Sequence, residues 1–389
     1  MNAMASATGA GHRQMMVIAG EASGDQHGAA VVRSITRRGE EVSFFGIGGG
    51  ALRKAGVEIV VDADQLSVVG ITEVAARLPG LWRGIATAKD MLRNRRPHLL
   101  LLIDFPDFNL HVAACAKRLG IPVLYYISPQ IWAWRRGRVA KIRDRVNHMA
   151  VILPFEAAFY RQNRVPVSFV GHPLADRYAA LPGAPVEQPP APVLGLLPGS
   201  REREVIGHLP AMLDAAHRIR RRTPGLRVIV SVAGSVPVAT VDRVLRATGS
   251  GHMVEVVKGP VEKVYRASSL VVAVSGTVTL EAAFFATPLI IIYRVSRLSY
   301  TLGKRLIRVP YIGLINLLAE EEIAPELIQD DVTGPKIAAT VTEMFEDPPR
   351  LRRIRERMRR LRQHLGGPGA SKRVADLALG FLFPDGKAL

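Results

Sequence analysis

The sequence is poor in cysteine and in acidic residues, and it contains no long apolar run. Cys115 is the only cysteine among 389 residues, so neither an intrachain disulfide nor a cysteine-rich zinc site can form. No stretch approaches roughly 18 consecutive apolar residues, which excludes a predicted membrane-spanning helix. Residues 1–14 lack the charged and apolar regions of a secretory signal. We therefore expect a cytoplasmic protein whose N-terminal tail, residues 1–14, is disordered.

Positive charge is in large excess, with 52 lysines and arginines against 34 acidic residues and a net charge of +18. Such an excess predicts an anionic partner: nucleic acid, an anionic membrane surface or phosphorylated substrates. No recognised nucleic-acid-binding module occurs, so nucleic acid is not the expected partner. Charge alone does not separate the membrane from the phosphorylated substrate.

Short apolar runs alternate with helical patterns through two similar halves of the chain. The run Leu99–Ile103 is typical of a central parallel strand, and Val193–Leu197 opens a second series. Five prolines within residues 181–192 predict a linker between the halves. We predict an α/β protein with two doubly wound parallel-sheet domains, at residues 15–180 and 193–349.

The last part of the chain, residues 350–389, is predicted to be a basic helical segment. Eight arginines occur between Arg350 and Arg362, and apolar residues recur there at helical spacing. The apolar stripe is narrow, so we expect it to pack on protein, with the arginines outward, at Leu351, Ile354, Met358 and Leu361.

In the first half, carboxylates follow two predicted strands. Glu21, Ser23 and Asp25 follow the first strand. The acidity of Glu21 and Asp25 favours sugar hydroxyls over a bare phosphate, although a tight turn with an N-capping Ser or Asp would use the same residues. Asp104 ends the buried run Leu99–Ile103, where partial burial would raise its pKa and suit a general base. Asp107 is more simply a helix cap.

In the second half, two strand-to-helix turns are suited to binding an anion. Gly199, Ser200 and Arg201 follow one strand, and Gly276 and Thr277 follow another, with Glu281 one turn inside the next helix. Free backbone N–H groups at helix starts and an arginine can grip a diphosphate, and Glu281 could reach a ribose. The alternative is that both are ordinary turns.

Two other patterns are weaker. Asp62-Ala63-Asp64 matches the D-x-D pattern of metal-dependent glycosyltransferases, but three residues match often by chance, and we predict no metal site. The aromatic run at residues 125–134, followed by Arg135, Arg136 and Arg138, could stack nucleobases or line an apolar, phosphate-rimmed site. The residues alone leave that choice open.

Eight segments, in order from residue 20 to residue 320, together resemble the lipid-A-disaccharide synthase family. They are GEASGDQHGA (20–29), IDFPDFN (103–109), YYISPQIWAWRRGRV (125–139), ILPFE (152–156), FVGHPLAD (169–176), LPGSREREV (197–205), SGTVTLEAAFFATPLIIIYRVS (275–296) and GLINLLAE (313–320). One departure is Phe105, where a smaller residue is expected; it would narrow the acceptor side.

The resemblance implies a GT-B fold, in which two Rossmann-like domains face each other across a cleft and a C-terminal helix crosses back. It implies an inverting glycosyltransferase that needs no metal or cofactor. The implied donor is UDP-2,3-diacylglucosamine, the acceptor is 2,3-diacylglucosamine 1-phosphate, and the product bond is β(1→6). Another GT-B enzyme, such as a UDP-N-acetylglucosamine 2-epimerase, is the alternative.

The resemblance also carries roles onto individual residues. Asp104 would be the base, Arg201 a diphosphate contact, and Glu281 and Asn316 nucleotide contacts, whereas Glu21 and Ser23 would lie in the acceptor half. Because the implied substrates are membrane lipids, we expect a peripheral protein on the cytoplasmic face of the inner membrane, held by its basic surface. A homodimer is left open.

Overall fold

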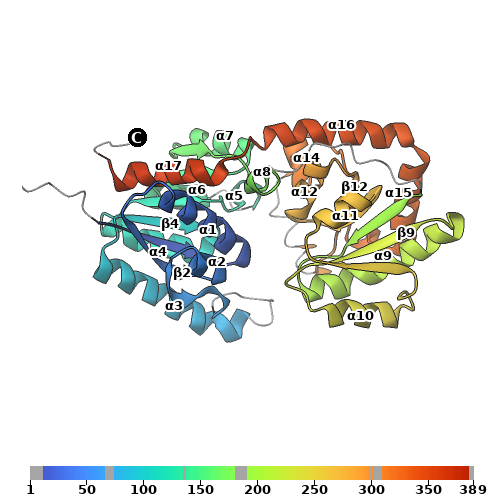
Figure 1. Ribbon diagram of the computed structural model, residues 1–389, viewed down its shortest axis with the longest axis horizontal. Helices are drawn as coiled ribbons and strands as arrows, with labels where there is room; N and C mark the ends of the chain where they lie inside the picture. The colour runs from blue at the N-terminus through green and yellow to red at the C-terminus, as the bar shows by residue number, and fades with distance from the viewer. Residues whose placement is uncertain are drawn as a thin grey trace, which may run out of the picture. The chain divides into compact units, whose positions relative to one another are not determined.

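A computed structural model describes residues 12–65, 74–134, 137–179, 191–297, 300–301 and 309–384 (Figure 1). The predicted linker lies almost wholly outside the described residues, as do most of the predicted N-terminal tail and Arg135 and Arg136. The chain divides into two compact units. The first comprises residues 1–179 together with 365–389, and the second comprises residues 180–364.

The first unit is built on a seven-stranded parallel sheet in the order β3-β2-β1-β4-β5-β6-β7. This is a doubly wound order, in which the chain changes direction across the sheet between β1 and β4. Its strands are β1 (Arg13–Ala19), β2 (Val42–Gly48), β3 (Glu58–Asp62), β4 (Leu99–Ile103), β5 (Val123–Tyr126), β6 (His148–Val151) and β7 (Val167–Phe169).

Helices cover both faces of this sheet. Met16, Leu100 and Leu102 enter one buried cluster, whereas Val17 and Leu101 enter the other, as the alternation of side chains along a strand requires. The helical segments are α1 (Ala22–Thr36), α2 (Gly50–Lys54), η1 (Ala63–Gln65), α3 (Val74–Arg95), α4 (Pro106–Arg118), α5 (Ile131–Trp134), α6 (Arg138–Arg145), α7 (Pro154–Gln162), α8 (Pro173–Arg177) and α17 (Ala370–Leu382).

The second unit repeats the same winding with a six-stranded parallel sheet in the order β10-β9-β8-β11-β12-β13. Its strands are β8 (Val193–Leu197), β9 (Arg227–Val232), β10 (Val254–Lys258), β11 (Leu270–Val274), β12 (Leu289–Tyr293) and β13 (Glu326–Ile328). Its helical segments are α9 (Glu202–Arg222), α10 (Val238–Ala247), α11 (Glu262–Ala267), α12 (Val278–Phe285), α14 (Leu314–Ala319), η2 (Gln329–Asp331), α15 (Gly334–Glu346) and α16 (Pro348–His364).

The C-terminal segment is shared between the units. Helix α16 packs on α12 and α15 of the second unit through a buried face made of Leu351, Ile354, Met358 and Leu361, as predicted. The helix that returns to the first unit is α17, which packs on α1, α8 and β4 (Figure 1). The Asp176 carboxylate accepts the backbone N–H groups of Gly369, Ala370 and Ser371, and so holds the start of α17.

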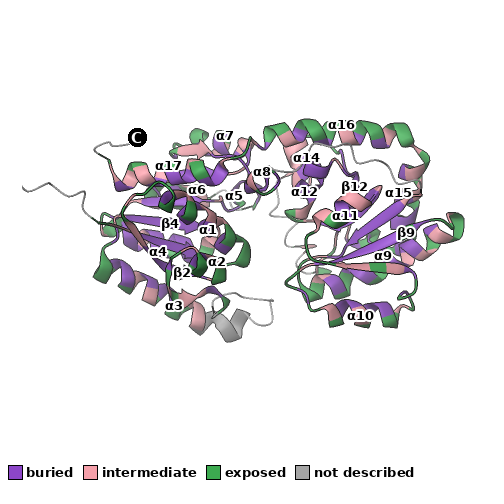
Figure 2. Ribbon diagram, in the orientation of Figure 1, coloured by how far each residue is buried: buried purple, intermediate pink, exposed green. Residues whose placement is uncertain are grey.

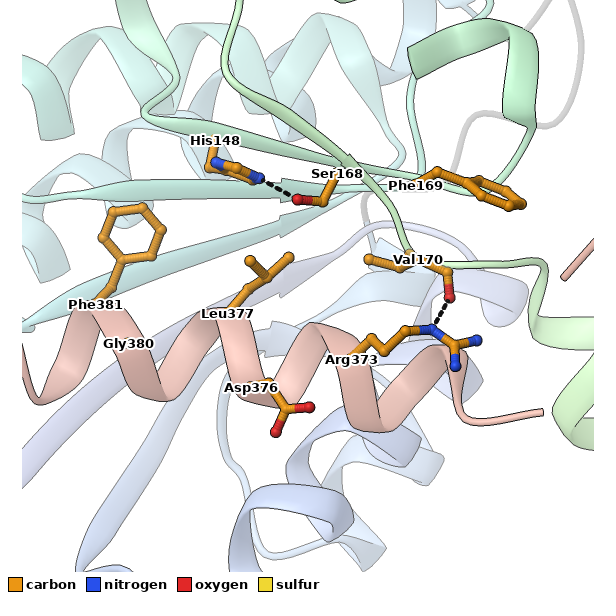
Figure 3. A pocket seen from close by; sticks show the side chains of 9 residues that line it. All are labelled: His148, Ser168, Phe169, Val170, Arg373, Asp376, Leu377, Gly380 and Phe381. Carbon is orange, nitrogen blue, oxygen red and sulfur yellow. Dashed lines mark hydrogen bonds between the residues drawn. The ribbon is translucent and has the colours of Figure 1, made fainter. Parts of the chain in front are cut away.

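A cavity of about 610 Å³ lies beneath α17, beside β6 and β7 (Figure 3). Its polar side chains bond within the protein. His148 Nε2 lies 2.9 Å from Ser168 Oγ, and the Arg373 guanidinium donates to the carbonyls of Val170, Gly367 and Pro368. The first contact joins β6 to β7, and the Arg373–Val170 bond ties α17 to the end of β7. No helix within the described ranges is long and apolar enough to cross a membrane.

Candidate functional site

Asp104 lies at the carboxyl edge of the first sheet, at the point where the winding reverses. Strands β1 and β4 are adjacent and parallel, with Ala19 paired to Ile103, so the loops that begin at Gly20 and Asp104 emerge side by side. Ligands of doubly wound sheets bind at this position. The structure therefore places Glu21 close enough to Asp104 for its charge to act on the Asp104 carboxyl.

The backbone at Asp104 is held in an unfavourable conformation. Asp104 and Phe105 both have positive φ angles, 45° and 49°, which cost free energy in residues other than glycine. The Asp104 carbonyl accepts hydrogen bonds from Tyr125 Oη and Asn109 Nδ2, each at 2.6 Å, and its N–H donates to the Tyr126 carbonyl at 3.1 Å. These bonds from the neighbouring strand and helix fix the direction of the Asp104 side chain.

The electrostatic environment of Asp104 favours its protonated form. Burial raises the pKa of the Asp104 carboxyl to about 6, and the negative charge of Glu21 adds to this, against a smaller opposing effect of the Phe105 N–H group. A carboxylate with this pKa is ionised at neutral pH and takes up a proton more readily than an exposed aspartate. This is the property required of a general base.

Phe105 packs directly over Gly20. A Cβ atom at Gly20 would lie 2.3 Å from the Phe105 ring, so only glycine fits there. The Phe105 ring also stacks on Phe108, with centroids 5.1 Å apart. The unexpected phenylalanine therefore joins the loops after β1 and β4.

The three polar residues after β1 divide into two kinds. Glu21 and Ser23 are exposed, whereas Asp25 is buried. The Asp25 carboxylate accepts the N–H groups of Gly49 at 2.6 Å and Ala51 at 2.7 Å, and so caps α2. The structure thus gives Asp25 a structural role, but it caps the distant helix α2 and not its own turn, which was the alternative to acceptor binding.

The aromatic segment is mostly core. Tyr125 and Tyr126 are fully buried, and the indole N–H of Trp132 donates to Glu156 at 3.1 Å. Burial raises the pKa of the Glu156 carboxyl to about 7, while hydrogen bonds from Leu153 and Trp132 oppose that rise. Trp134 is 40% exposed. The buried rings cannot stack a nucleobase.

In the second unit, the chain turns from β8 into a helix at Gly199–Arg201, as predicted. The backbone N–H groups of this turn donate to a carboxylate of the protein itself. The N–H groups of Ser200 and Arg201 donate to Glu204 at 2.8 and 3.3 Å, and the exposed Arg201 guanidinium lies 3.1 Å from the same carboxylate. Gly199 has φ +121°, and a Cβ there would lie 2.5 Å from Glu204. An anion bound at this turn would replace Glu204 as the partner of Arg201.

The turn after β11 lies beside it, because β8 and β11 are adjacent, with Leu197 paired to Ala273. Gly276 and Thr277 are exposed at the start of α12, whereas Glu281 is buried one turn further on. Ser275 Oγ donates to the Ile312 carbonyl at 3.3 Å, which joins this turn to the loop before α14. The structure thus gathers Gly199, Ser200, Arg201, Gly276 and Thr277 at one edge of the second sheet.

Asn316 has a different place from the one that the resemblance implied. Its side chain is 0% exposed, and all its hydrogen-bonding groups bond within the protein. Nδ2 donates to the Ala324 carbonyl and to Glu326, and Oδ1 accepts the N–H groups of Ile323 and Ala324, at 2.7 to 3.0 Å. Asn316 therefore supports the loop near the turns and presents no free group to a nucleotide in this structure.

Sequence reasoning missed three buried or half-buried residues that shape this edge. Glu326 accepts the N–H groups of Ile312 and Gly313, at 2.8 and 2.9 Å. His208 accepts the Arg294 N–H at Nε2, so its Nδ1 donates to the Glu204 carbonyl, and the Gln329 amide binds Val295 through both groups. Each of the three has a partner in another element of the fold, at Ile312 for Glu326, Arg294 for His208 and Val295 for Gln329, so no local pattern could indicate it.

The carboxylates of the D-x-D pattern interact with other groups of the protein. Asp62 accepts hydrogen bonds from the Arg53 guanidinium and the Asp64 N–H, both at 3.1 Å. Across the residues that the structure describes, no three His, Cys, Asp or Glu side chains are grouped as a metal site requires. That the reaction needs no metal ion stays a prediction.

The two doubly wound units, each with polar loops at the carboxyl edge, define a protein of the GT-B class. Solved structures with this fold include the calicheamicin glycosyltransferase CalG4 (TM-score 0.60, 17% identity, 95% of this chain and 98% of that chain covered). A UDP-N-acetylglucosamine 2-epimerase from Neisseria meningitidis bound to UDP-GlcNAc is similar too (TM-score 0.60, 12% identity, 94% and 99% covered). At these identities the likeness shows the fold alone.

Sequence comparison identifies the family. A model of the lipid-A-disaccharide synthetase family matches residues 15–381. The lipid-A-disaccharide synthase of Geobacter metallireducens is 46% identical over 378 residues, which cover 95% of this chain and 98% of that protein, and the synthase of Geobacter sulfurreducens is 45% identical over 377 residues (95% and 97%). The chain belongs to the lipid-A-disaccharide synthase family.

The contacts of Asn316 predict a structural role that can be tested. Replacing Asn316 with alanine removes the side-chain partner of both the N–H and the carbonyl of Ala324, and one hydrogen bond each from Glu326 and Ile323. We therefore expect the melting temperature of the protein to fall, at a cost of about 1–3 kcal/mol for a lost buried partner. Calorimetry of the variant measures this, and the exposed Thr277→Ala serves as control. Unchanged thermal stability combined with lost UDP affinity would instead restore the direct nucleotide contact.

Proposed function

We propose that this protein joins UDP-2,3-diacylglucosamine to 2,3-diacylglucosamine 1-phosphate, giving the β(1→6)-linked disaccharide 1-phosphate and UDP. The observation that carries the proposal is identity of 40–46% to proteins named lipid-A-disaccharide synthase over almost the whole chain. The epimerase alternative has weaker support, since likeness to solved epimerases is at 10–12% identity and concerns the fold. The raised pKa of Asp104 adds chemical support.

The proposed reaction is a direct displacement. Asp104 takes the proton of the acceptor 6-hydroxyl as that oxygen attacks the anomeric carbon of the donor. The bond from the anomeric carbon to the UDP β-phosphate oxygen breaks, its electron pair leaves with UDP, and attack from the opposite face inverts the anomeric centre. Arg201 and the N–H groups at Ser200, Gly276 and Thr277 stabilise the charge on the leaving group.

The remaining site residues take supporting places in this proposal. Glu21 and Ser23 bind acceptor hydroxyls, and Glu281 binds the nucleotide. Asp25 and Asn316 hold the loops that carry these groups. Both substrates are acylated, so we further propose that the enzyme rests on the cytoplasmic face of the inner membrane, attracted by its net charge of +18. We propose the basic stretch Arg297–Arg308 as one contact with the membrane; it lies largely outside the described residues.

The function is tested by incubating the protein with both acylated sugars and measuring UDP release. We expect UDP to form only when donor and acceptor are both present, and to form equally in EDTA, since Arg201 and backbone N–H groups replace a metal ion. UDP-GlcNAc epimerised without an acceptor would support the epimerase instead. Loss of turnover in EDTA and rescue by Mg²⁺ or Mn²⁺ would instead support a metal site at Asp62 and Asp64.

A pH profile tests the role of Asp104. A base must be deprotonated, so we expect turnover to decline as the pH falls below about 6, the raised pKa of this carboxyl. Replacing Glu21 with glutamine removes a negative charge that raises this pKa, and the decline should move to lower pH. Asp104→Asn should lower turnover roughly 10²–10⁴-fold with UDP affinity intact. Near-normal turnover of Asp104→Asn would exclude it as the base.

Binding of UDP alone tests the role of Arg201. We expect Arg201→Ala to weaken UDP binding by about 1.5–3 kcal/mol, the worth of a charge-assisted hydrogen bond, as measured by calorimetry. Arg203→Ala is the matched control, because Arg203 is an exposed arginine two residues further along the same helix. Equal UDP affinity in the two variants would remove Arg201 from the diphosphate site.

A further inference from the structure

The eight arginines of α16 are not equivalent. Arg350 pairs with Glu343 at 2.7 Å, Arg357 with Glu321 at 3.1 Å, and Arg353 lies 3.9 Å from Asp347. These three arginines, which we call the paired set, follow one another at helical spacing along one side of the buried apolar face. Their charge is balanced by acids of the same unit.

A second set lies on the other side of that apolar face. Arg352, Arg355 and Arg359 recur at intervals of three and four residues, so they form one row along the helix, which we call the unpaired row. Within the described part of the chain, no carboxylate lies within 4 Å of any of them. Glu356, the one acidic residue between Arg350 and Arg362, is exposed and forms no ion pair with the row.

Arg355 stands at the centre of the unpaired row and is only half-exposed. Its Nη2 donates to the Ser269 carbonyl at 3.3 Å, but its Nη1 is buried without a hydrogen-bond partner. Burial and the charges of Arg359 and Arg352 lower the pKa of Arg355 below its usual value. Because Nη1 is buried, it cannot itself bond to an outside anion. The positive charge of Arg355 nevertheless adds to the charges of Arg352 and Arg359, and three like charges in one row attract an anionic partner.

The unpaired row suits an extended anionic surface better than a single ion. Seven residues of helix separate Arg352 from Arg359, about 10 Å along the axis at 1.5 Å per residue. Both end residues are exposed, and Figure 2 shows α16 exposed along its outer side. One phosphate could not contact arginines spread over this length, whereas neighbouring phosphates of a membrane surface could bind the exposed guanidinium groups of Arg352 and Arg359.

We propose that the unpaired row, Arg352, Arg355 and Arg359, is the surface through which this protein binds the phosphate headgroups of an anionic membrane. The proposal rests on the proposed function, in which both substrates are membrane lipids. This proposal differs from a general attraction by net charge. The paired set on the same helix has the same number of arginines, but acidic partners balance their charge, so only the unpaired row is expected to bind the membrane. The apolar face between the two sets stays packed on α12 and α15 and does not enter the lipid.

Two triple variants with equal loss of charge test this proposal. R352Q/R355Q/R359Q removes the unpaired row, and R350Q/R353Q/R357Q removes the paired set. Co-sedimentation of the full chain with vesicles of phosphatidylglycerol and phosphatidylcholine measures binding. We expect the first variant to bind roughly 100-fold more weakly, about 1 kcal/mol for each arginine, and the second to bind like the parent protein. Equal losses in both variants would overturn the proposal.

Further experiments distinguish lipid headgroups from free phosphate and from nucleic acid as the anion that is bound. Vesicles of phosphatidylcholine alone should not bind, and inorganic phosphate at an ionic strength matched with chloride should not displace the protein from anionic vesicles. Displacement by phosphate would mean a free-anion site and overturn the membrane assignment. Preferential binding of duplex DNA, lost in the first variant only, would do the same in favour of nucleic acid.

The assay of function is kept distinct from the assay of binding. With both substrates dispersed in detergent micelles, UDP release should be equal in the parent protein and both variants, because α16 carries no residue of the proposed site. If no preparation releases UDP but the vesicle result holds, the proposed function fails and the membrane surface stands. The melting temperatures of both variants show whether each is folded. The proposal is supported if both variants are folded and only R352Q/R355Q/R359Q loses vesicle binding.

Discussion

The hydrogen bonds that Tyr125 and Asn109 donate to the carbonyl of Asp104 determine the chemistry of the first unit. They hold a positive φ angle at a residue that is not glycine, immediately after a fully buried strand. Without two well-placed donors, the chain would leave the sheet edge in a relaxed conformation, and the carboxylate would point elsewhere. The same buried surroundings raise the pKa of the Asp104 carboxyl, so position and proton affinity have one cause.

A second theme is the use of carboxylates to organise loops. Asp25, Asp176, Glu204 and Glu326 each accept two or more backbone N–H groups, and each fixes a turn or the start of a helix. Glu204 serves this structural purpose and also pairs with the Arg201 guanidinium, so the two uses of a carboxylate are compatible. The unpaired row of α16 is a surface on which positive charge stays available to an outside partner.

Glu204 is the most consequential of these carboxylates. It occupies the N–H groups of Ser200 and Arg201 and approaches the Arg201 guanidinium, so it stands where an anionic ligand is proposed to bind. Gly199 allows this close approach because it has no side chain. Glu204 thus satisfies the backbone donors of this strand-to-helix turn, and the same N–H groups suit a phosphate oxygen.

The sequence by itself determined the two doubly wound sheets, the place of Asp104 after a buried strand, the turns at Gly199 and Gly276, and the buried face of α16. These features depend on local order: apolar runs, helical periodicity and residues that end strands. Only the tertiary structure decided that Asp25 and Asn316 are occupied by backbone groups, that α17 rather than α16 returns to the first unit, and which arginines of α16 have partners. Each of these depends on contacts that reach outside a single strand or helix, such as Asn316 with Glu326 or Arg357 with Glu321, and the pattern within one element carries no record of a partner outside it.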